Sequence, residues 1–192
     1  MTQPTVVGDA DAELVRRMAS GDESALRSLY ALHARRLFAH ACRVTGDRAT
    51  AEEVLQDSLL AAWRGAHAFR GESRVITWLL GIVHRQALNA TRRKRLPTSD
   101  LGQAAETAAC PALLDEHVAA ADRRRALTAS IARLSPEHRA VLELVFYQGL
   151  SLAEVARVCG CPIGTVKSRL SYAKVHLRSA LERAGQRAED LL

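Results

Sequence analysis

Apolar residues recur at three- and four-residue steps along most of the chain, the spacing that gathers side chains on one face of an α-helix. The first long stripe begins after Asp22, a residue type that caps helix N-termini, and it ends at Gly46. No segment shows the alternation that is typical of a half-buried strand. The pattern predicts an all-α fold, in which this helix turns six residues to the core: Leu26, Leu29, Tyr30, His33, Leu37 and Ala41.

Two more helices are predicted in the first half of the chain. Thr50 stands three residues before Glu53, as in a capping box, so we expect a helix over residues 51–66 with the apolar stripe Leu55, Leu59 and Trp63. Gly71 interrupts the pattern. Ser73 can then cap a third long helix, whose buried face holds Ile76, Leu79, Leu80, Val83 and Ala87.

A change of composition divides the chain after this helix. Residues 96–112 contain Pro97, Gly102 and Pro111 among small and polar residues. A loop of this length is uncommon inside a compact domain. We therefore expect two small helical domains, residues 1–95 and 113–192, joined by a flexible linker over residues 96–112.

The second domain is also predicted to be helical. A helix over residues 113–134 precedes Ser135 and Pro136, a cap followed by a proline at the first helical position, and the next helix should bury Val141, Leu142, Val145 and Phe146. A capping box formed by Ser151 and Glu154 opens a short helix that extends to Val158. After a turn over residues 160–162, a final helix carries the apolar stripe Val166, Leu170, Ala173, Leu177 and Leu181.

The last two of these helices, joined by a turn that contains glycine, match a helix-turn-helix arrangement. The second of them carries side chains that can reach phosphates or base edges in a DNA major groove: Lys167, Ser168, Arg169, Ser171, Tyr172 and Lys174. A solvated basic face is the alternative for that helix taken alone. The whole arrangement favours DNA binding.

Charge adds a second candidate surface. The 192 residues carry a net charge of +6, yet residues 63–95 alone hold eight Lys and Arg against the single acid Glu72. A local surplus of this kind suits a polyphosphate backbone. Phe69 and Trp78 lie in the same segment, where they either stack on unpaired bases or pack in the core.

The preceding helix has the opposite character. Its exposed side holds the acidic and polar residues Glu52, Glu53, Gln56 and Asp57. Beside a basic segment, this face is typical of a protein-docking surface, with a solvated helix flank as the alternative.

Several function classes are excluded by what the sequence lacks. The longest apolar run, residues 75–83, is too short to span a membrane, which takes about 20 residues. The N-terminus lacks a signal peptide, so we expect a cytoplasmic protein with thiols that are buried or inert, while a redox role for Cys110 or for the pair Cys159 and Cys161 stays open. No P-loop, nucleophile elbow or zinc-protease motif is present, and we expect no enzymatic activity, cofactor or metal.

The chain resembles the extracytoplasmic-function group of bacterial RNA polymerase sigma factors. The resemblance rests on the segments 51–63, 69–73, 77–79 and 92–95 in the first domain and on 134–139, 149–156 and 160–170 in the second. It implies a region 2-like domain, a region 4-like helix-turn-helix domain, and a protein that directs core RNA polymerase to promoters in a stress or envelope response. The implied partners are core polymerase, promoter DNA and an anti-sigma factor.

The resemblance also implies roles for single residues. The polymerase-binding set is Glu52, Glu53, Gln56, Asp57 and Trp63. The minus-ten set is Arg70, Ser73, Arg74, Trp78, Arg85, Asn89, Arg92 and Arg93. The minus-thirty-five set is Thr165, Lys167, Ser168, Arg169, Ser171, Tyr172 and Lys174. Arg85 and Asn89 stand where the group usually has Asn and Asp, so the usual minus-ten base preference does not carry over.

Two other interpretations remain at this point. A stand-alone helix-turn-helix regulator would use the first domain for dimerisation or effector binding, but it does not require the basic segment 63–95. An enzyme acting on nucleic acid lacks any metal or nucleophile arrangement here. We also expect the two domains to fold against each other in the free chain and to cover both DNA surfaces.

Overall fold

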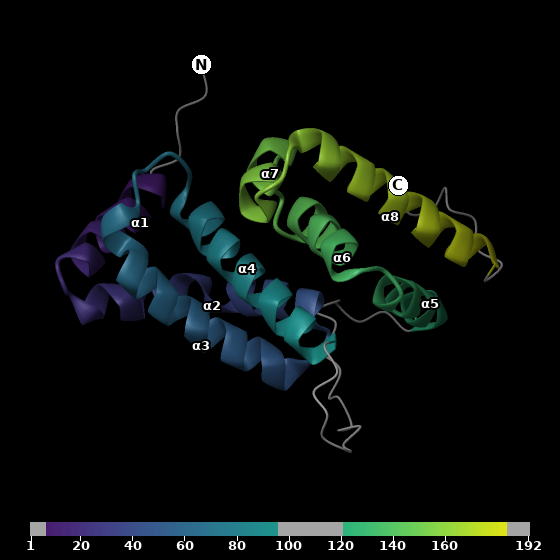
Figure 1. Cartoon of the computed structure of the whole chain (residues 1–192), viewed down its shortest axis with the longest axis horizontal. Helices are drawn as coiled ribbons and strands as arrows, with labels where there is room; N and C mark the ends of the chain where they lie inside the picture. Colours follow the sequence, from purple (N-terminus) through teal and green to yellow (C-terminus); the bar gives the residue numbers. More distant parts are fainter. Residues whose placement is uncertain (1–6, 96–120, 184–192) are drawn as a thin grey trace.

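The structure is a computed structural model, and it describes residues 7–95 and 121–183. Helices α1 (Val7–Ala19), α2 (Glu23–Thr45), α3 (Arg48–Gly65) and α4 (Val75–Arg95) form the first half, with a short 3-10 turn η1 (Ala66–Ala68) before the loop that leads into α4. The second half consists of α5 (Ala121–Ala132), α6 (Pro136–Leu142), a π-helical turn η3 (Glu143–Tyr147), α7 (Leu152–Cys159) and α8 (Ile163–Arg183). Within these ranges there is no strand, so the all-α prediction is confirmed (Figure 1).

Local signals explain most helix ends. Asp22 caps α2 and Gly46 ends it in the left-handed conformation, as predicted. Ser135 caps α6, and Ser151 and Glu154 form the complete capping box of α7. The predicted cap of α3 was wrong: the helix begins at Arg48, and Asp47 accepts a bond from the Thr50 backbone, because the carboxylate stands one turn earlier than Thr50.

Helix α1 was not anticipated. It buries Val15 and Met18 against the first domain, and the buried side chain of Asp11 lies 2.9 Å from His33 Nε2 on α2. The stripe formed by Leu14, Val15 and Met18 is the signal that could have revealed it.

The core stripes are largely as predicted, with two errors. Tyr30 is 45% exposed, and Phe146 is 56% exposed while Leu144 is fully buried in its place. The π turn explains the error at Phe146. The prediction assumed α-helical spacing, but the wider spiral of the π turn directs Leu144 to the core instead. Residues 113–120 of the predicted helix, the linker 96–112 and the side chain of Leu181 lie outside the described residues.

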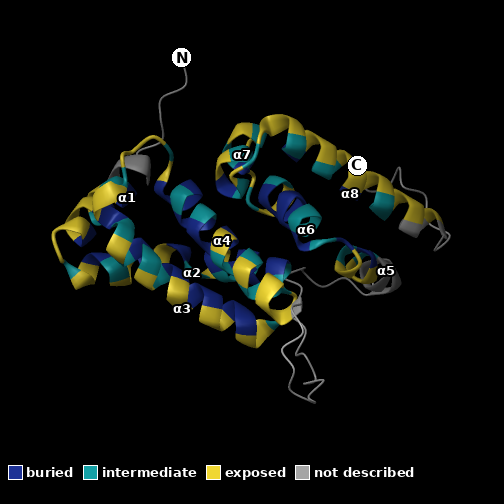
Figure 2. Cartoon of the chain, in the orientation of Figure 1, coloured by how far each residue is buried: buried dark blue, intermediate teal, exposed yellow. Residues whose placement is uncertain are grey.

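One hydrophobic cluster runs through both halves of the molecule. It joins residues of α1 to α4 with Val141, Leu144, Leu150, Val155 and Val158 of the second half. Helix α4 packs against α7, and α2 packs against α6, so α4 lies in the middle of the molecule with α3 on one side and α7 on the other (Figure 1). Figure 2 shows the resulting buried band along α4 and α6 and the exposed outer side of α8.

Candidate functional site

The outer face of α3 is acidic and open to solvent. Glu52, Glu53, Gln56 and Asp57 are all exposed, at the spacing that keeps them on neighbouring turns of one face. Trp63, the fifth residue of this set, is half-buried and packs against the core instead. The four acidic and polar side chains are therefore accessible to solvent, while Trp63 contributes to the core.

The loop between η1 and α4 forms an aromatic pocket. The rings of Phe69 and Trp78 lie 5.0 Å apart, centroid to centroid, and both side chains are half-buried. They line a hollow of about 310 Å³ together with Ala68, Arg70, Glu72 and Ser73. The alternatives of core packing and base stacking are thus not exclusive, because the rings close the core and still face a pocket.

A basic face runs along α4 from this pocket. Arg85, Asn89, Arg92 and Arg93 are all exposed, and their spacing of four, seven and eight residues places them on the same side of the helix. The neighbouring Lys94 is engaged elsewhere, since its Nζ donates to Asp47 at 2.7 Å. Bonds from Lys94 and Thr50 lower the pKa of Asp47 to about 2. The predicted minus-ten residues of α4 thus share one accessible face.

Arg74 differs from the rest of its predicted set. Its guanidinium donates to the Glu154 carboxylate on α7 at 2.6 and 3.0 Å. Burial opposes ionisation of Glu154, but the bonds from Ser151 and Arg74 outweigh it, so the Glu154 pKa lies below its usual value. Nothing in the sequence linked these two residues, which stand 80 positions apart.

The outer face of α8 presents most of the predicted minus-thirty-five residues. Lys167, Ser168, Ser171, Tyr172 and Lys174 are exposed, so the expectation that domain packing would cover this surface was wrong. The packing uses α7 rather than α8, and this leaves the second helix of the pair open.

The remaining two residues of that set are half-buried. Arg169 points back to the turn and donates to Cys161 Sγ at 3.9 Å, while the carbonyl of Thr165 accepts a bond from Ser168. Tyr172, though exposed, has its ring 4.5 Å from that of His138 on α6. The α8 face therefore contains free polar side chains beside others that the protein already holds in place.

A buried polar cluster between the halves was missed by the sequence analysis. His40 on α2 and Glu143 on η3 are in direct contact through Nδ1 and a carboxylate oxygen, and both are at most 1% exposed. His84 on α4 lies 5.5 Å away, ring to ring, from His40. Burial lowers the pKa of His84 to about 3, so this imidazole is neutral at physiological pH. No sequence signal joins positions 103 residues apart.

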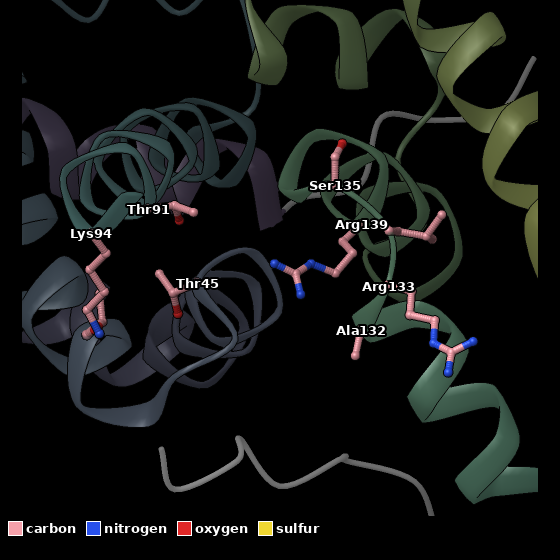
Figure 3. Close-up of a pocket in the computed structure, with 9 residues that line it drawn as sticks. Thr45, Thr91, Lys94, Ala132, Arg133, Ser135 and Arg139 are labelled. Carbon is pink, nitrogen blue, oxygen red and sulfur yellow. The ribbon is translucent and has the colours of Figure 1, made fainter. Parts of the chain in front are cut away.

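A pocket of about 500 Å³ also lies along the seam, the contact surface between the two halves of the molecule. Figure 3 shows Thr45, Thr91 and Lys94 on one side and Ser135 and Arg139 on the other. Their polar atoms are engaged by the protein itself: Thr45 and Thr91 donate to backbone carbonyls, and Arg139 Nη2 donates to the Val44 carbonyl. In this polar hollow the protein itself already bonds Thr45, Thr91, Lys94 and Ser135, together with one nitrogen of Arg139.

The cysteines differ among themselves. Cys159 and Cys161 are free and half-buried, and burial raises the pKa of the Cys159 thiol to about 12, which keeps it protonated. Cys42 is disulfide-bonded, contrary to the expectation of thiols. Among residues 7–95 and 121–183, no group of His, Cys, Asp and Glu is arranged to hold a metal ion, and no helix has the length and hydropathy to cross a membrane.

Known proteins resemble the chain in both sequence and fold. Residues 29–96 match the family described as Sigma-70 region 2, and residues 124–177 match Sigma-70, region 4. The ECF RNA polymerase sigma factor SigL of Mycobacterium tuberculosis is 34% identical over 168 residues, which cover 87% of this chain and 94% of that protein. SigM of the same species is 35% identical over 173 residues, covering 90% of this chain and 85% of SigM.

Solved structures show the same architecture. The complex of CnrH with the cytosolic domain of CnrY matches with a TM-score of 0.65 at 24% identity, covering 91% of this chain and 98% of that one. Sigma factor RpoE of Bartonella quintana, solved with the anti-sigma factor NepR, matches with a TM-score of 0.61 at 28% identity, covering 81% of this chain and 96% of that one. The chain belongs to the extracytoplasmic-function group of sigma factors and directs RNA polymerase to promoters.

Proposed function

We propose that this sigma factor divides its work among three surfaces: the α3 face for core polymerase, the η1–α4 surface for the minus-ten element and the α8 face for the minus-thirty-five element. The observation that carries the proposal is that all three are exposed and chemically distinct. One is acidic, one is basic and aromatic, and one mixes hydroxyls with cations. The two domains would then be residues 1–95 and 113–192, with 96–112 as the linker between them.

The acidic face suits a protein partner. A carboxylate-rich helix repels the DNA backbone and attracts a basic surface of a polymerase subunit. We assign docking to Glu52, Glu53, Gln56 and Asp57, together with the half-buried Trp63 of the same helix.

The pocket between Phe69 and Trp78 suits a single unpaired base. Its aromatic walls offer π-faces for stacking, and the cations of the adjoining α4 face can hold the displaced strand. The minus-ten residues are then Arg70, Ser73, Arg74, Trp78, Arg85, Asn89, Arg92 and Arg93. A pocket that takes one base out of the stack would favour strand opening, because only an unpaired base can enter it.

The α8 face suits a duplex major groove. An exposed helix after a tight turn carries Lys167 for phosphate and Ser168 and Tyr172 for base edges. Thr165, Arg169, Ser171 and Lys174 complete the set, with Arg169 holding the turn that precedes the helix.

The same assignment also indicates where the chain acts and which further partner it has. The chain would act in the cytoplasm, where bacterial polymerase transcribes, and would itself catalyse no reaction, because the polymerase supplies the chemistry. The likeness to RpoE, solved with an anti-sigma factor, supports an anti-sigma partner for this chain during a stress or envelope response.

The test is run-off transcription with core polymerase on mapped promoters. The double variant Glu53→Lys/Asp57→Lys should lose co-purification with core polymerase and all promoter-specific transcripts, because both side chains are exposed one turn apart. The matched control is Glu13→Lys, an exposed acid on α1 that belongs to none of the three residue sets and pairs with Arg16 of its own helix. Retained polymerase binding by the double variant would contradict the assignment of the docking face.

A further inference from the structure

Two side chains on the outer face of α8 contact aromatic rings that come from the elements before the helix-turn-helix. The ring of Tyr172 lies 4.5 Å from the ring of His138 on α6, centroid to centroid, and the two ring planes are inclined by 39°. The Lys174 ammonium lies 5.6 Å from the centre of the Phe146 ring on η3. The Tyr172 contact is the closer of the two, and aromatic rings at this separation attract each other beyond the area that they bury.

The imidazole of His138 is itself held in place. Its Nδ1 lies 2.6 Å from the hydroxyl oxygen of Ser135, the N-cap residue of α6, and the same hydroxyl accepts a bond from the His138 backbone. Burial and the nearby guanidinium of Arg169 hold the pKa of His138 below its usual value, so the ring is a neutral imidazole at physiological pH. Tyr172 therefore meets a fixed and uncharged partner.

The backbone of α8 is also fixed at this point. Ala173, the next residue, is fully buried and packs in a small apolar cluster with Leu134 and Leu142. One turn further along α8, the ring of His176 lies nearly parallel to that of Tyr172, at 6.4 Å and 15°. Two side-chain torsions of Tyr172 are then left to set, and the ring from α6 on its flank restricts both.

Tyr172 is held without being covered. It remains 57% exposed, so part of its ring and its hydroxyl can still reach a ligand. An exposed side chain that samples several rotamers must be ordered on binding, and this ordering costs free energy. In this chain the ordering of the ring belongs to folding instead. A ring that cannot swing contacts one base position, and it cannot adapt when the base there is wrong.

We propose that His138 is a positioning residue for DNA reading: it fixes the Tyr172 ring so that this ring discriminates among bases at a single position of the minus-thirty-five element. This inference rests on the proposed assignment of the α8 face to that element. The surface that determines specificity then extends beyond the helix-turn-helix to α6. His138 serves discrimination more than affinity, because it acts through Tyr172 and brings no positive charge to a phosphate.

The first test measures base discrimination by the full chain bound to core polymerase. Tyr172→Ala, compared with wild type on duplexes that carry each single-base change in the element, identifies the position that Tyr172 reads. At that position His138→Ala should lower the ratio of correct to incorrect binding by about two- to tenfold, the range that an aromatic pair is worth. The ratios at the other positions should stay unchanged.

His138→Phe is the matched control for this measurement. It keeps an aromatic ring beside Tyr172, and the backbone N–H of residue 138 can still donate to Ser135. This variant should restore most of the discrimination that His138→Ala loses. The double variant His138→Ala/Tyr172→Ala should match Tyr172→Ala alone, because His138 acts only through Tyr172. Circular dichroism checks that each variant keeps its helices.

The second test needs no DNA and observes the ring directly by nuclear magnetic resonance. The full chain has three tyrosines, and in a sample with ring-labelled tyrosine the variant Tyr172→Phe identifies the signal of Tyr172. His138→Ala should move this signal towards that of free tyrosine, because it removes the ring current of the imidazole. His138→Phe should keep the signal displaced. His176→Ala, which removes the more distant ring, should move it less.

The outcomes distinguish the positioning role from the assignment on which it rests. An unmoved Tyr172 signal in a folded His138→Ala chain would overturn the positioning role and leave base reading by Tyr172 intact. Equal discrimination by wild type and Tyr172→Ala would refute base reading by Tyr172, and the inference with it. A loss that is uniform over all positions, or that His138→Phe does not restore, would show that His138 stabilises α6 and does not position the ring.

Discussion

The outer face of α8 and the seam between the halves both use polar side chains, but these side chains differ in burial and in how far they depend on a partner. Lys167, Ser168 and Tyr172 are exposed, and the contacts of Ser168 with the Thr165 carbonyl and of Tyr172 with the His138 ring stay within one half of the molecule. His40 and Glu143 are buried together, and removal of His40 would leave the Glu143 carboxylate with the bond from Gln148 alone. A surface of the first kind can diverge with its ligand. A contact of the second kind can change only as a pair.

The largest effect is expected when one member of the buried pair His40 and Glu143 is removed. His40→Leu should lower the free energy of unfolding by about 3–5 kcal/mol, because it leaves the Glu143 carboxylate buried with a hydrogen bond from Gln148 alone. Urea unfolding followed by circular dichroism would measure the loss. The double variant His40→Leu/Glu143→Leu should recover most of the lost free energy of unfolding. An equal loss in both variants would show that lost packing, and not an unpaired buried charge, causes the destabilisation.

The next largest effect is expected on the α8 face. Ser168→Ala and Tyr172→Ala should each cost about 1–3 kcal/mol at particular minus-thirty-five bases, because a lost base contact removes discrimination at one position. Binding to a panel of single-base variants of the element would show it. Uniform weakening across the panel would rule out direct readout by these two side chains.

A smaller effect tests a third kind of polar site, the helix cap. Asp47→Ala should cost about 1 kcal/mol at neutral pH, because the carboxylate caps α3. Since its pKa is held at about 2, below the ordinary value near 4, the ionised form supplies stability above pH 4 that is lost as the pH falls towards 2. The difference in unfolding free energy between wild type and variant should shrink over that window, and a constant difference would exclude the carboxylate charge as the cause.

The smallest effect is expected from a single phosphate contact. Lys167→Ala should weaken binding equally on all sequences and reduce the slope of log affinity against log salt by about 0.9. Titrations at three or four salt concentrations would measure the slope. Lys174→Ala is the informative comparison, because Lys174 Nζ lies 5.6 Å from the centre of the Phe146 ring and should contribute less to the slope.

The sequence predicted those features that depend on local chemistry. Ser135 and Ser151 cap helices because each side chain reaches a backbone donor three residues away, and both caps were found. Thr50 was chosen as a cap by the same rule, but Asp47 is also three residues from a donor and accepts bonds as a carboxylate. Local rules of this kind name the candidates and do not always rank them.

Features that depend on contacts between distant segments were missed. The pairing of His40 with Glu143 and of Arg74 with Glu154 joins residues 103 and 80 positions apart. Each of these residues, read alone, looks like an ordinary polar position on a helix. Only the packing of α4 on α7 and of α2 on α6 gives them partners.

The π turn at η3 limits how this chain can vary in length. The Gln148 amide donates to the Glu143 carbonyl across five residues, one more than in an α-helix. Loss of one residue from this segment would restore α-helical spacing and rotate everything after it by about 100° relative to α6. Helices α7 and α8 would then be turned away from α4. Homologues should accordingly conserve the number of residues between Ser135 and Ser151 more strictly than their identities.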